Sequence, residues 1–416
     1  MAEAATELLR TSDGRPLKAA LAQAQQRAKW RAFFLVLPLL AFVVLTFIIP
    51  IVKMLERSVY HDGFSASAPG MVAWFAAHPA SEDMSEPAFA VLVADLAFMQ
   101  KNRTAGLAGT RINYTVPGTI SIFKAAGRAA ETLEPPFKDK VIALSPLWGQ
   151  PTTWVAMRNA ASPWTADFYA VSGDLERDAT NSLIRVPENQ RIYVYLFLKT
   201  FVLSAVITGL CLLLAFPIAH LLAVLPMAKS NLLMILVLLP FWTSLLVRTT
   251  SWIALLQEQG MVNDLMVGLG VYGDDGRIRM IYNQTGTIIV MTHILLPFMV
   301  LPLYSVMRVI PPTYARAARS LGATSWTTFR RIYLPQTLPG IAAGSLLVFI
   351  LAVGYYITPA LVGGADGQLI SNLISFHMNK SNWSMAAALA AILLAAVLLL
   401  YWLYDRLIGI DRLKLG

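Results

Sequence analysis

The sequence has few charged residues and almost no cysteine. Only 14% of its 416 residues are Asp, Glu, Lys or Arg, whereas soluble domains have about a quarter. The single Cys211 excludes an intrachain disulfide and leaves the redox compartment undetermined. Hydrophobic residues make up 56% of the chain, and its mean hydropathy is +0.58. A net charge of +9 in such a chain is typical of membrane topology rather than of nucleic-acid binding.

Six apolar runs are long enough to cross a bilayer, which takes about 20 residues. They cover residues 32–52, 194–225, 232–256, 285–307, 337–357 and 385–404. The first run is too long for the apolar core of a signal peptide and has no convincing cleavage site, so we expect it to be retained. The sequence therefore predicts an all-α membrane protein with six transmembrane helices.

Lys and Arg in the loops predict the orientation, because short cytoplasmic loops carry an excess of them. They gather in both terminal tails and after the second and fourth runs, whereas acids outnumber them after the third. Both termini are therefore expected in the cytoplasm. The predicted parts are a cytoplasmic tail (1–31), a first transmembrane helix (32–55), a periplasmic insert (56–192), a core with five transmembrane helices (193–408) and a cytoplasmic tail (409–416).

The insert is large enough to form a small domain. Residues 86–100 and 121–132 have helical apolar spacing, so we expect a mainly helical insert, with loops where Pro, Ser and Asn are common. It contains no Cys pair, His cluster or paired acids that would indicate a metal or hydrolytic site. It is either a cap that packs on the spans or a surface that contacts a partner.

A basic segment, YARAARSLGATSWTTFRRIYLP at 314–335, lies between the fourth and fifth runs and contains no acid. Pro311-Pro312 should stop the preceding helix, and Thr313 can then cap a short helix from Tyr314. Gly322 is well placed to end this helix in a left-handed conformation. The sequence predicts a short helix followed by a glycine turn.

A second short helix is expected after Gly322. Thr324 or Ser325 can begin it, and Leu334-Pro335 would close it before the fifth run. Such a pair of helices in water fits a lever that a soluble partner pushes. The residues alone fit equally well an amphipathic helix in the lipid headgroups.

The spacing within this segment resembles the EAA signature of binding-protein-dependent ABC importer permeases. The match comprises Arg316-Ala317-Ala318, three residues, Gly322, nine residues, and then Ile332-Tyr333-Leu334-Pro335. Arg316 departs from the family pattern, in which Glu is usual. Blocks at 239–263 and 338–364 are similar to the spermidine/putrescine permease branch. The resemblance covers about 193–406 and the first run, but not the insert.

The resemblance implies half of a type I importer in the bacterial inner membrane. Its partners would be a second, non-identical permease, an ABC ATPase dimer and a periplasmic solute-binding protein. ATP and Mg would bind the ATPase, because this sequence has no GxxxxGK[ST] loop. We expect no catalytic residue, cofactor, metal site or nucleic-acid partner for this chain. The segment 313–335 would couple ATP hydrolysis to transport, through Arg316, Ala317, Ala318, Gly322, Ile332, Leu334 and Pro335.

Arg248 is the most costly residue within an expected span, since Arg at a span centre costs about 2.5–3.5 kcal/mol on insertion. It lines the substrate pathway or pairs with the second permease, or else it snorkels to the outer edge. His220 and His293 are expected to be packed polar residues rather than ligands. The candidate pathway residues are Trp242, Thr243, Arg248, Trp252, Tyr355 and Tyr356.

The resemblance favours a polyamine such as putrescine or spermidine as the solute. A dication needs acids and aromatic faces, yet none of the six runs contains Asp or Glu. An amino-acid-like or opine-like solute therefore stays open. Outside transport, a membrane enzyme would need intramembrane groupings that five scattered histidines do not supply, and a sensor or scaffold would not need an ATPase-docking signature.

Overall fold

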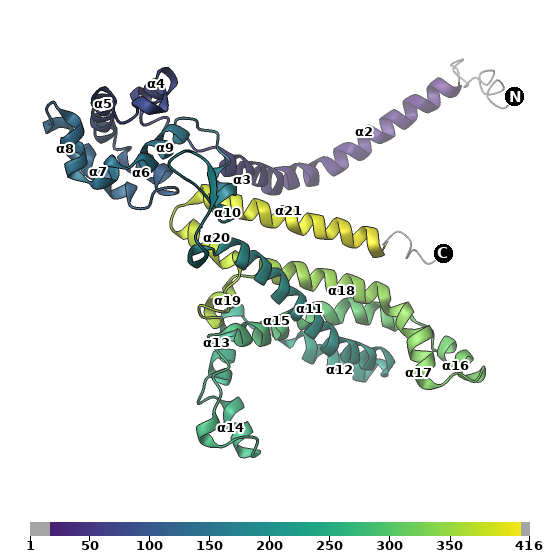
Figure 1. Cartoon of the computed structure of the whole chain (residues 1–416). Coiled ribbons are helices and arrows are strands. Elements are labelled where there is room, and N and C mark those ends of the chain that lie inside the picture. Colours follow the sequence, from purple (N-terminus) through teal and green to yellow (C-terminus); the bar gives the residue numbers. More distant parts are fainter. Residues whose placement is uncertain (1–16, 409–416) are drawn as a thin grey trace. The chain divides into compact units, whose positions relative to one another are not determined.

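The structure is a computed structural model that describes residues 17–408 (Figure 1). Most of the predicted N-terminal tail and the predicted tail 409–416 lie outside the described residues. The chain divides into two compact units, Met1–Arg57 and Ser58–Gly416, which are described separately.

The first unit is a long apolar helix with one irregular turn. Its described elements are α2 (Leu17–Val43), a π-helical turn (Val44–Ile48) and α3 (Ile49–Val59), which runs into the second unit. Pro50 lies just after the turn, and its missing N–H removes one regular helical hydrogen bond there. The stretch Ala24–Val59 is long and apolar enough to span a membrane, and no residue of its most apolar window is buried. The predicted first span lies inside this stretch.

The insert is more helical than its composition predicts. Its elements are α4 (Pro69–Ala77), α5 (Glu86–Asn102), α6 (Ala105–Asn113), α7 (Thr119–Ala129), α8 (Phe137–Leu144), α9 (Pro151–Ala160), α10 (Asp167–Ser172) and a hairpin of β1 (Leu175–Arg177) and β2 (Leu183–Arg185). The two predicted helices are confirmed as α5 and α7, the latter extended by a 3₁₀ turn (Ala130–Thr132). The prediction of loops elsewhere was wrong. Pro69 and Pro151 begin helices, where proline loses no hydrogen bond.

The insert has a hydrophobic core of its own. Trp148 and Trp154 are fully buried in it, and the Trp154 indole N–H donates to the Trp148 carbonyl at 2.9 Å. The Phe89 ring meets the Trp154 ring edge to face, with centroids 4.9 Å apart. Asp95 of α5 accepts backbone N–H groups of Gly70 (3.1 Å) and Met71 (2.6 Å), which ties α4 to the bundle. These contacts make the bundle from Phe64 to Ala161 a packed unit.

The chain enters and leaves this bundle at one place. Tyr60 and Trp164 form an antiparallel β-bridge, and the His61 N–H donates to the Pro163 carbonyl at 2.8 Å. Beyond the bridge, Phe168 of α10 packs in a buried cluster with Ile370 and Met385 of the C-terminal half. The insert therefore contacts the core through α10 and through Asp174, which follows it.

The core is a set of long apolar helices with short ones between them. They are α11 (Tyr193–Val224), α12 (Met227–Leu238), α13 (Leu245–Leu256), α14 (Met261–Gly268), α15 (Gln284–Val309), α16 (Pro312–Ser320), α17 (Ser325–Thr328), α18 (Leu334–Gly354), α19 (Ile357–Val362), α20 (Ile370–Asn379) and α21 (Trp383–Ile408). In the described chain, five helical stretches are long and apolar enough to cross a membrane, or six if a bent pair counts as one. This agrees with the all-α membrane fold predicted from the sequence.

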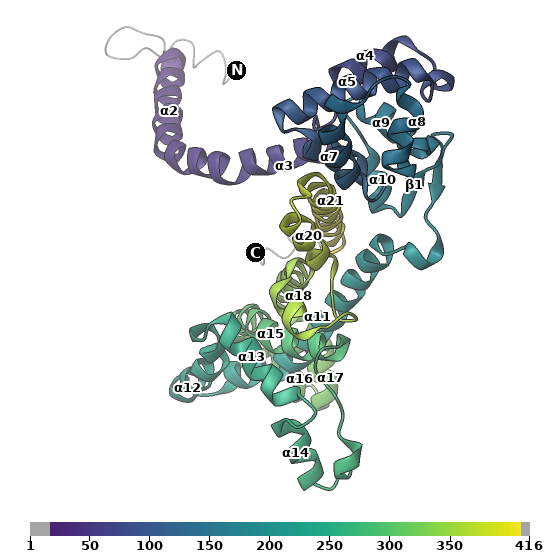
Figure 2. The same cartoon turned by 90° about the vertical axis from the view of Figure 1, so that its left-hand side faces the viewer.

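Three of these helices, α11, α15 and α18, lie side by side (Figures 1 and 2) and share one buried cluster. Gly340 and Gly344, four residues apart on α18, allow the close approach to α15. A Cβ at Gly340 would lie 3.1 Å from the Pro302 carbonyl oxygen, and one at Gly344 only 2.7 Å from the Met299 sulfur. Small residues at this spacing are a common way for membrane helices to pack closely.

The third apolar run is not one straight helix. It forms two segments, Met227–Trp242 and Leu245–Gly268, which are bent by 98° at the break between them. Ser244 caps the second segment, since its hydroxyl accepts the Val247 N–H at 3.2 Å. The expectation of a continuous span over 232–256 is corrected by this break. The length of an apolar run shows that a segment can cross a membrane, but it does not show where the backbone changes direction.

Candidate functional site

The segment 313–335 begins with α16 directly after the two prolines. Pro312 is its first residue, and Pro311 precedes it without a side-chain cap. The prediction that Thr313 caps a helix from Tyr314 was therefore wrong by two residues. Proline suits the first helical position because its φ is already helical and the N–H that it lacks would have no helical partner there. The stop of the preceding helix is confirmed, since α15 ends at Val309.

Gly322 ends α16 as the spacing predicts. Its φ is +85°, in the left-handed region that favours glycine. Its N–H donates to the Arg319 carbonyl at 2.9 Å, and the Ala323 N–H donates to the Ala318 carbonyl at 3.0 Å. These two bonds form a Schellman motif, in which the glycine turn satisfies the last helical carbonyls. A Cβ on Gly322 would meet nothing within 4 Å, so only backbone conformation demands glycine here.

The second helix begins at the predicted cap but continues further than predicted. The Thr324 hydroxyl accepts the Thr327 N–H at 3.2 Å and starts α17. A π-helical turn (Phe329–Tyr333) then leads directly into α18. Leu334-Pro335 therefore does not close the helix. Pro335 lies in the first turn of α18, next to the π-helical turn, where the regular hydrogen-bond ladder is already interrupted.

Apolar and basic side chains are exposed together along this segment. Leu321 is 89% exposed and Trp326 is 68% exposed. The exposed basic residues are Arg316, Arg319, Arg330 and Arg331. Within residues 17–408, the six ion pairs of the structure involve none of these four arginines. The surface is therefore apolar and positively charged, which suits a partner with a complementary acidic groove.

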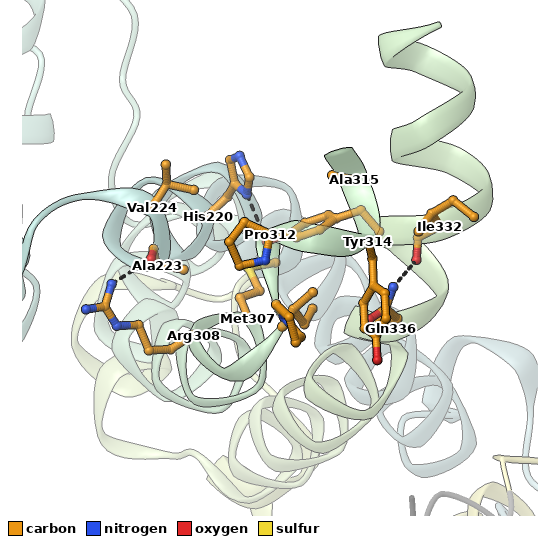
Figure 3. Close-up of a pocket in the computed structure, with 13 residues that line it drawn as sticks. His220, Ala223, Val224, Met307, Arg308, Pro312, Tyr314, Ala315, Ile332 and Gln336 are labelled. Carbon is orange, nitrogen blue, oxygen red and sulfur yellow. Dashed lines mark hydrogen bonds between the residues drawn. The ribbon is translucent and has the colours of Figure 1, made fainter. Parts of the chain in front are cut away.

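A cavity of about 400 Å³ lies between this segment and the ends of α11 and α15. Figure 3 shows Arg308 beside the last turn of α11, where it donates to the Ala223 carbonyl at 2.7 Å. A cation at this end also complements the helix dipole. On the other side, the Gln336 side chain donates to the Ile332 carbonyl at 2.8 Å (Figure 3). Ile332 thus lines the cavity, whereas Arg316, Ala317 and Gly322 are exposed on the outside of the segment.

Arg248 lies at the break in the third apolar run and binds backbone carbonyls. Its guanidinium donates to the carbonyls of Pro240 and Thr243, the latter at 3.1 Å. Its Nε also lies 3.4 Å from the Thr243 hydroxyl. Carbonyls exposed at a broken helix need such donors because lipid supplies none. Arg248 therefore reaches back across the break instead of extending along α13.

Two of the aromatic candidates come together near Arg248, and two do not. Trp252 and Tyr355 pack against the same buried cluster. Trp242 is 72% exposed, and Tyr356 is exposed as well. The backbone carbonyls of Tyr355 and Tyr356 accept side-chain donors of α20, and these bonds hold the link between α18 and α19. The six candidates therefore do not form one compact site.

His293, which the sequence predicts to be a packed polar residue, joins this group. Its Nδ1 accepts the Trp252 indole N–H at 3.0 Å, and the rings meet 5.1 Å apart. Arg248 lies four residues before Trp252 on α13, so the two side chains share one face of that helix. The residues around a histidine in an apolar run do not indicate that it will bond to a side chain 41 residues away. The group consisting of Arg248, Trp252, His293 and Tyr355 is called the donor cluster below.

In the part of the chain that the structure describes, no three His, Cys, Asp or Glu side chains are grouped to hold a metal ion.

Comparisons with known proteins find relatives of the core. Residues 191–408 match the model of the family described as "Binding-protein-dependent transport system inner membrane component". The spermidine/putrescine transport system permease protein PotB of Escherichia coli K12 is 38% identical over 222 residues, which cover 52% of this chain and 80% of PotB. PotB of Haemophilus influenzae is 34% identical over 216 residues, with 52% and 75% covered.

Other matches are more distant. The inner membrane ABC transporter permease protein YdcU of E. coli K12 is 31% identical over 229 residues, which cover 52% of this chain and 73% of YdcU. Among solved structures, a bacterial ABC transporter involved in importing alginate matches with a TM-score of 0.47 and 19% identity, covering 61% of this chain and 86% of that one.

The matched region contains all the long helices of the core and the segment 313–335. The insert lies outside it. The relatives are permease subunits of ABC transporters, so this chain has a transport role rather than a catalytic one. It is a multi-pass protein of the bacterial inner membrane. The chain belongs to the family of binding-protein-dependent transport system inner membrane components and resembles its polyamine permeases.

Proposed function

We propose that this chain is one permease half of an ATP-driven importer and moves a small polar solute into the cytoplasm by alternating access. A separate ABC ATPase dimer would bind ATP and Mg and dock on the segment 313–335. The observation that carries this proposal is that segment's exposed apolar and basic surface, built on a helix, a left-handed glycine and a second helix. Movement there would act directly on α15 and α18, because α18 is continuous with the segment and only Ile310 and Pro311 separate α15 from α16.

A polyamine such as putrescine or spermidine is the solute we propose first. Support comes from the PotB relatives, whose names state spermidine and putrescine transport. A second, non-identical permease and a periplasmic solute-binding protein would complete the importer. The companion permease would supply the acidic groups that a polyamine needs, because the six apolar runs of this chain have none.

An amino-acid-like solute is the second candidate, and the donor cluster favours it. Arg248 is cationic, and the cluster contains no carboxylate to attract an ammonium group. The positive charge of Arg248 suits a solute that carries a carboxylate. This candidate uses the same machinery and differs only in which solute is moved.

The sidedness follows from the same proposal. The insert would face the periplasm, and the segment 313–335 and both termini would face the cytoplasm. The native Cys211 is buried, so it gives little background in cysteine labelling. Single cysteines at Ser65 and Ser325 should react from opposite sides of the membrane. Labelling of both from the same side would contradict this arrangement.

Transport itself is tested with the assembled complex in proteoliposomes. The chain is co-purified with its ATPase and companion permease, and ATP-dependent uptake is measured with the purified binding protein outside. Radiolabelled putrescine, spermidine and a neutral amino acid are compared. Uptake of a polyamine would support the first candidate, and uptake of the amino acid alone would support the second. A complex that binds the ATPase but moves no solute would indicate a sensor or scaffold.

A further inference from the structure

An aromatic stack runs along the segment 313–335 from its exposed tip into the core. The Trp326 and Phe329 rings stack with centroids 5.7 Å apart, and the Phe329 and Tyr333 rings stack at 6.2 Å. Residues three and four apart on a helix lie on one face, so these rings form a continuous row. The row begins at a side chain that is mostly exposed and ends at a half-buried one.

Two side chains of α11 meet this row. The Phe216 ring meets Phe329 edge to face at 6.0 Å, and the His220 ring meets Tyr333 edge to face at 5.1 Å. The Tyr333 hydroxyl also lies 2.9 Å from His220 Nδ1, within hydrogen-bond distance. The segment and α11 are thus joined by two aromatic contacts, one of which has a directional hydrogen bond.

The backbone is irregular on both sides of this junction. Phe329–Tyr333 is a π-helical turn, a feature that often occurs at functional sites. On α11, Pro217 lies between the two contacting residues and removes one helical hydrogen bond. Each partner can therefore bend locally at the point where they touch.

The junction also has space beside it. His220 and Tyr333 both line the cavity of about 400 Å³ shown in Figure 3. A close-packed interface would resist any shift of its side chains. Here the Tyr333 ring can move without displacing a packed neighbour on its cavity side.

We infer that His220 and Tyr333 are positioning residues that link movement of the segment 313–335 to α11. The inference rests on the proposed coupling role of that segment and goes beyond its docking surface. When the ATPase moves the exposed end at Trp326, the row of rings would carry the shift to Tyr333. The hydrogen bond to His220 would then make α11 follow, because a stacked ring alone can slide whereas a hydrogen bond has a preferred direction.

The test uses the assembled transporter in proteoliposomes, with uptake and ATP hydrolysis measured on the same preparation. Tyr333→Phe keeps the ring and removes only the hydroxyl. His220→Leu removes the partner, and His220→Gln keeps a polar side chain that can still bond to the tyrosine. Tyr304→Phe is the matched control, because Tyr304 packs against the same core cluster but its hydroxyl has no hydrogen-bond partner in the described chain.

The expected result is less uptake per ATP hydrolysed, with an unchanged amount of assembled transporter. Tyr333→Phe and His220→Leu should hydrolyse ATP normally but move about fivefold less solute per ATP, the effect of losing one typical hydrogen bond from the conformational equilibrium. The double variant should be no worse than either single one, because both remove the same interaction. His220→Gln should retain much of the wild-type ratio, and Tyr304→Phe all of it.

The inference is overturned if wild-type complex shows coupled uptake while Tyr333→Phe and His220→Leu keep its ratio of uptake to ATP hydrolysis. It is also overturned if the effects of the two single changes simply add. Absence of coupled uptake in the wild-type complex would instead contradict the proposed function itself. A variant that lowers uptake and hydrolysis equally has lost active complex, and this outcome counts against a positioning role.

Discussion

The carboxylate of Asp174, in the insert, accepts the backbone N–H of Val194, in the first turn of α11, at 2.9 Å. It also accepts the N–H groups of Ile192 and Tyr193, both at 3.1 Å. Asp174 is buried and has a φ of +56°. One side chain therefore satisfies three N–H groups at the start of a long apolar helix and fastens the hairpin to it.

Replacing this residue should destabilise the start of α11. Asp174→Ala would remove the acceptor of three N–H groups at this helix start, at a cost of about 0.5–2 kcal/mol. Asp174→Asn should cost less, because its amide oxygen still accepts and Asn tolerates a left-handed backbone. The measurement is the Tm of the solubilised protein, which should fall less for Asp174→Asn than for Asp174→Ala. Asp178→Ala, at an exposed turn of the same hairpin, is the control and should lower Tm less, because the bonds that Asp178 accepts lie in solvent. Equal shifts for Asp174→Ala and Asp178→Ala would contradict the capping role.

The conformation of Gly322 should decide whether the segment 313–335 couples. With a φ of +85° and open space around it, Gly322 excludes other residues only through the backbone. A non-glycine residue in this region costs about 1–2 kcal/mol, with Asn and Asp affected least. Gly322→Val should therefore abolish ATP-driven uptake while the protein stays in the membrane. Gly322→Asp should impair uptake strongly, since it also places an acid in a basic surface. Gly322→Asn should retain most of the uptake. Equal uptake in the Val and Asn variants would show that the turn's conformation is unimportant.

Several of these features were predictable because they depend on local spacing. The long helices follow from apolar run length, as at Tyr193–Val224 and Gln284–Val309. Gly322 follows from its place after a short helical pattern, and its left-handed φ confirms the predicted helix end. In each case the residues that determine the structure are near neighbours in the sequence.

Other features could not be predicted because they depend on residues far apart or on direction. The 98° break in the third run lies in an apolar stretch that resembles a continuous span. It is held by Arg248 reaching back to Pro240. The contact between Trp252 and His293 joins two different helices, and the sequence around either residue does not indicate that the other is its partner. Prolines that begin helices in the insert resemble loop prolines until the backbone is known.

The positive charge of Arg316 should matter for ATPase docking. Arg316 is exposed and forms no ion pair with the described residues, so it is available for an acid on the ATPase. Arg316→Glu should weaken co-purification with the native ATPase and lower uptake per ATP, although Glu is usual at this position in the family. Arg316→Lys keeps the charge and is the control. Unchanged or improved coupling with Glu would show that Arg316 meets no acid.

Arg248 should be needed for the shape of the third span, a role separate from any attraction between its charge and the solute. Its guanidinium bridges the carbonyls of Pro240 and Thr243. Lys has one compact charge and cannot span both acceptors with the geometry of a guanidinium. Arg248→Lys should reduce the maximal uptake rate several-fold and lower the Tm of the complex, with little change in which solute is preferred. Arg279→Lys, on an exposed loop, is the control. A change in solute preference without a loss of Tm would instead place Arg248 in a binding site.

The helical bundle of the insert should be removable without loss of the transmembrane core. Its ends meet at the bridge between Tyr60 and Trp164, so a short Gly-Ser linker can replace residues 64–161. A longer deletion that included Asp174 would also remove the cap of α11. The shortened chain should insert and bind its ATPase, because α10 and the hairpin remain.

Transport by this shortened chain separates the two roles expected for the bundle. If the bundle contacts the binding protein, uptake at limiting binding protein should fall strongly and recover partly when more is added, since only the affinity has changed.

Deletion also removes Arg111, whose Nη2 lies 3.3 Å from Oδ2 of Asp167 in α10. Burial raises the pKa of Asp167, but hydrogen bonds from Arg177 and Thr165 and the charge of Arg111 outweigh it and hold the pKa below its ordinary value. Because Arg177 stays in the shortened chain, Asp167 should remain paired, and full-length Arg111→Met is the control for losing the Arg111 contact alone. Full uptake by the shortened chain at every concentration of binding protein would show that the bundle neither contacts that partner nor caps the entrance.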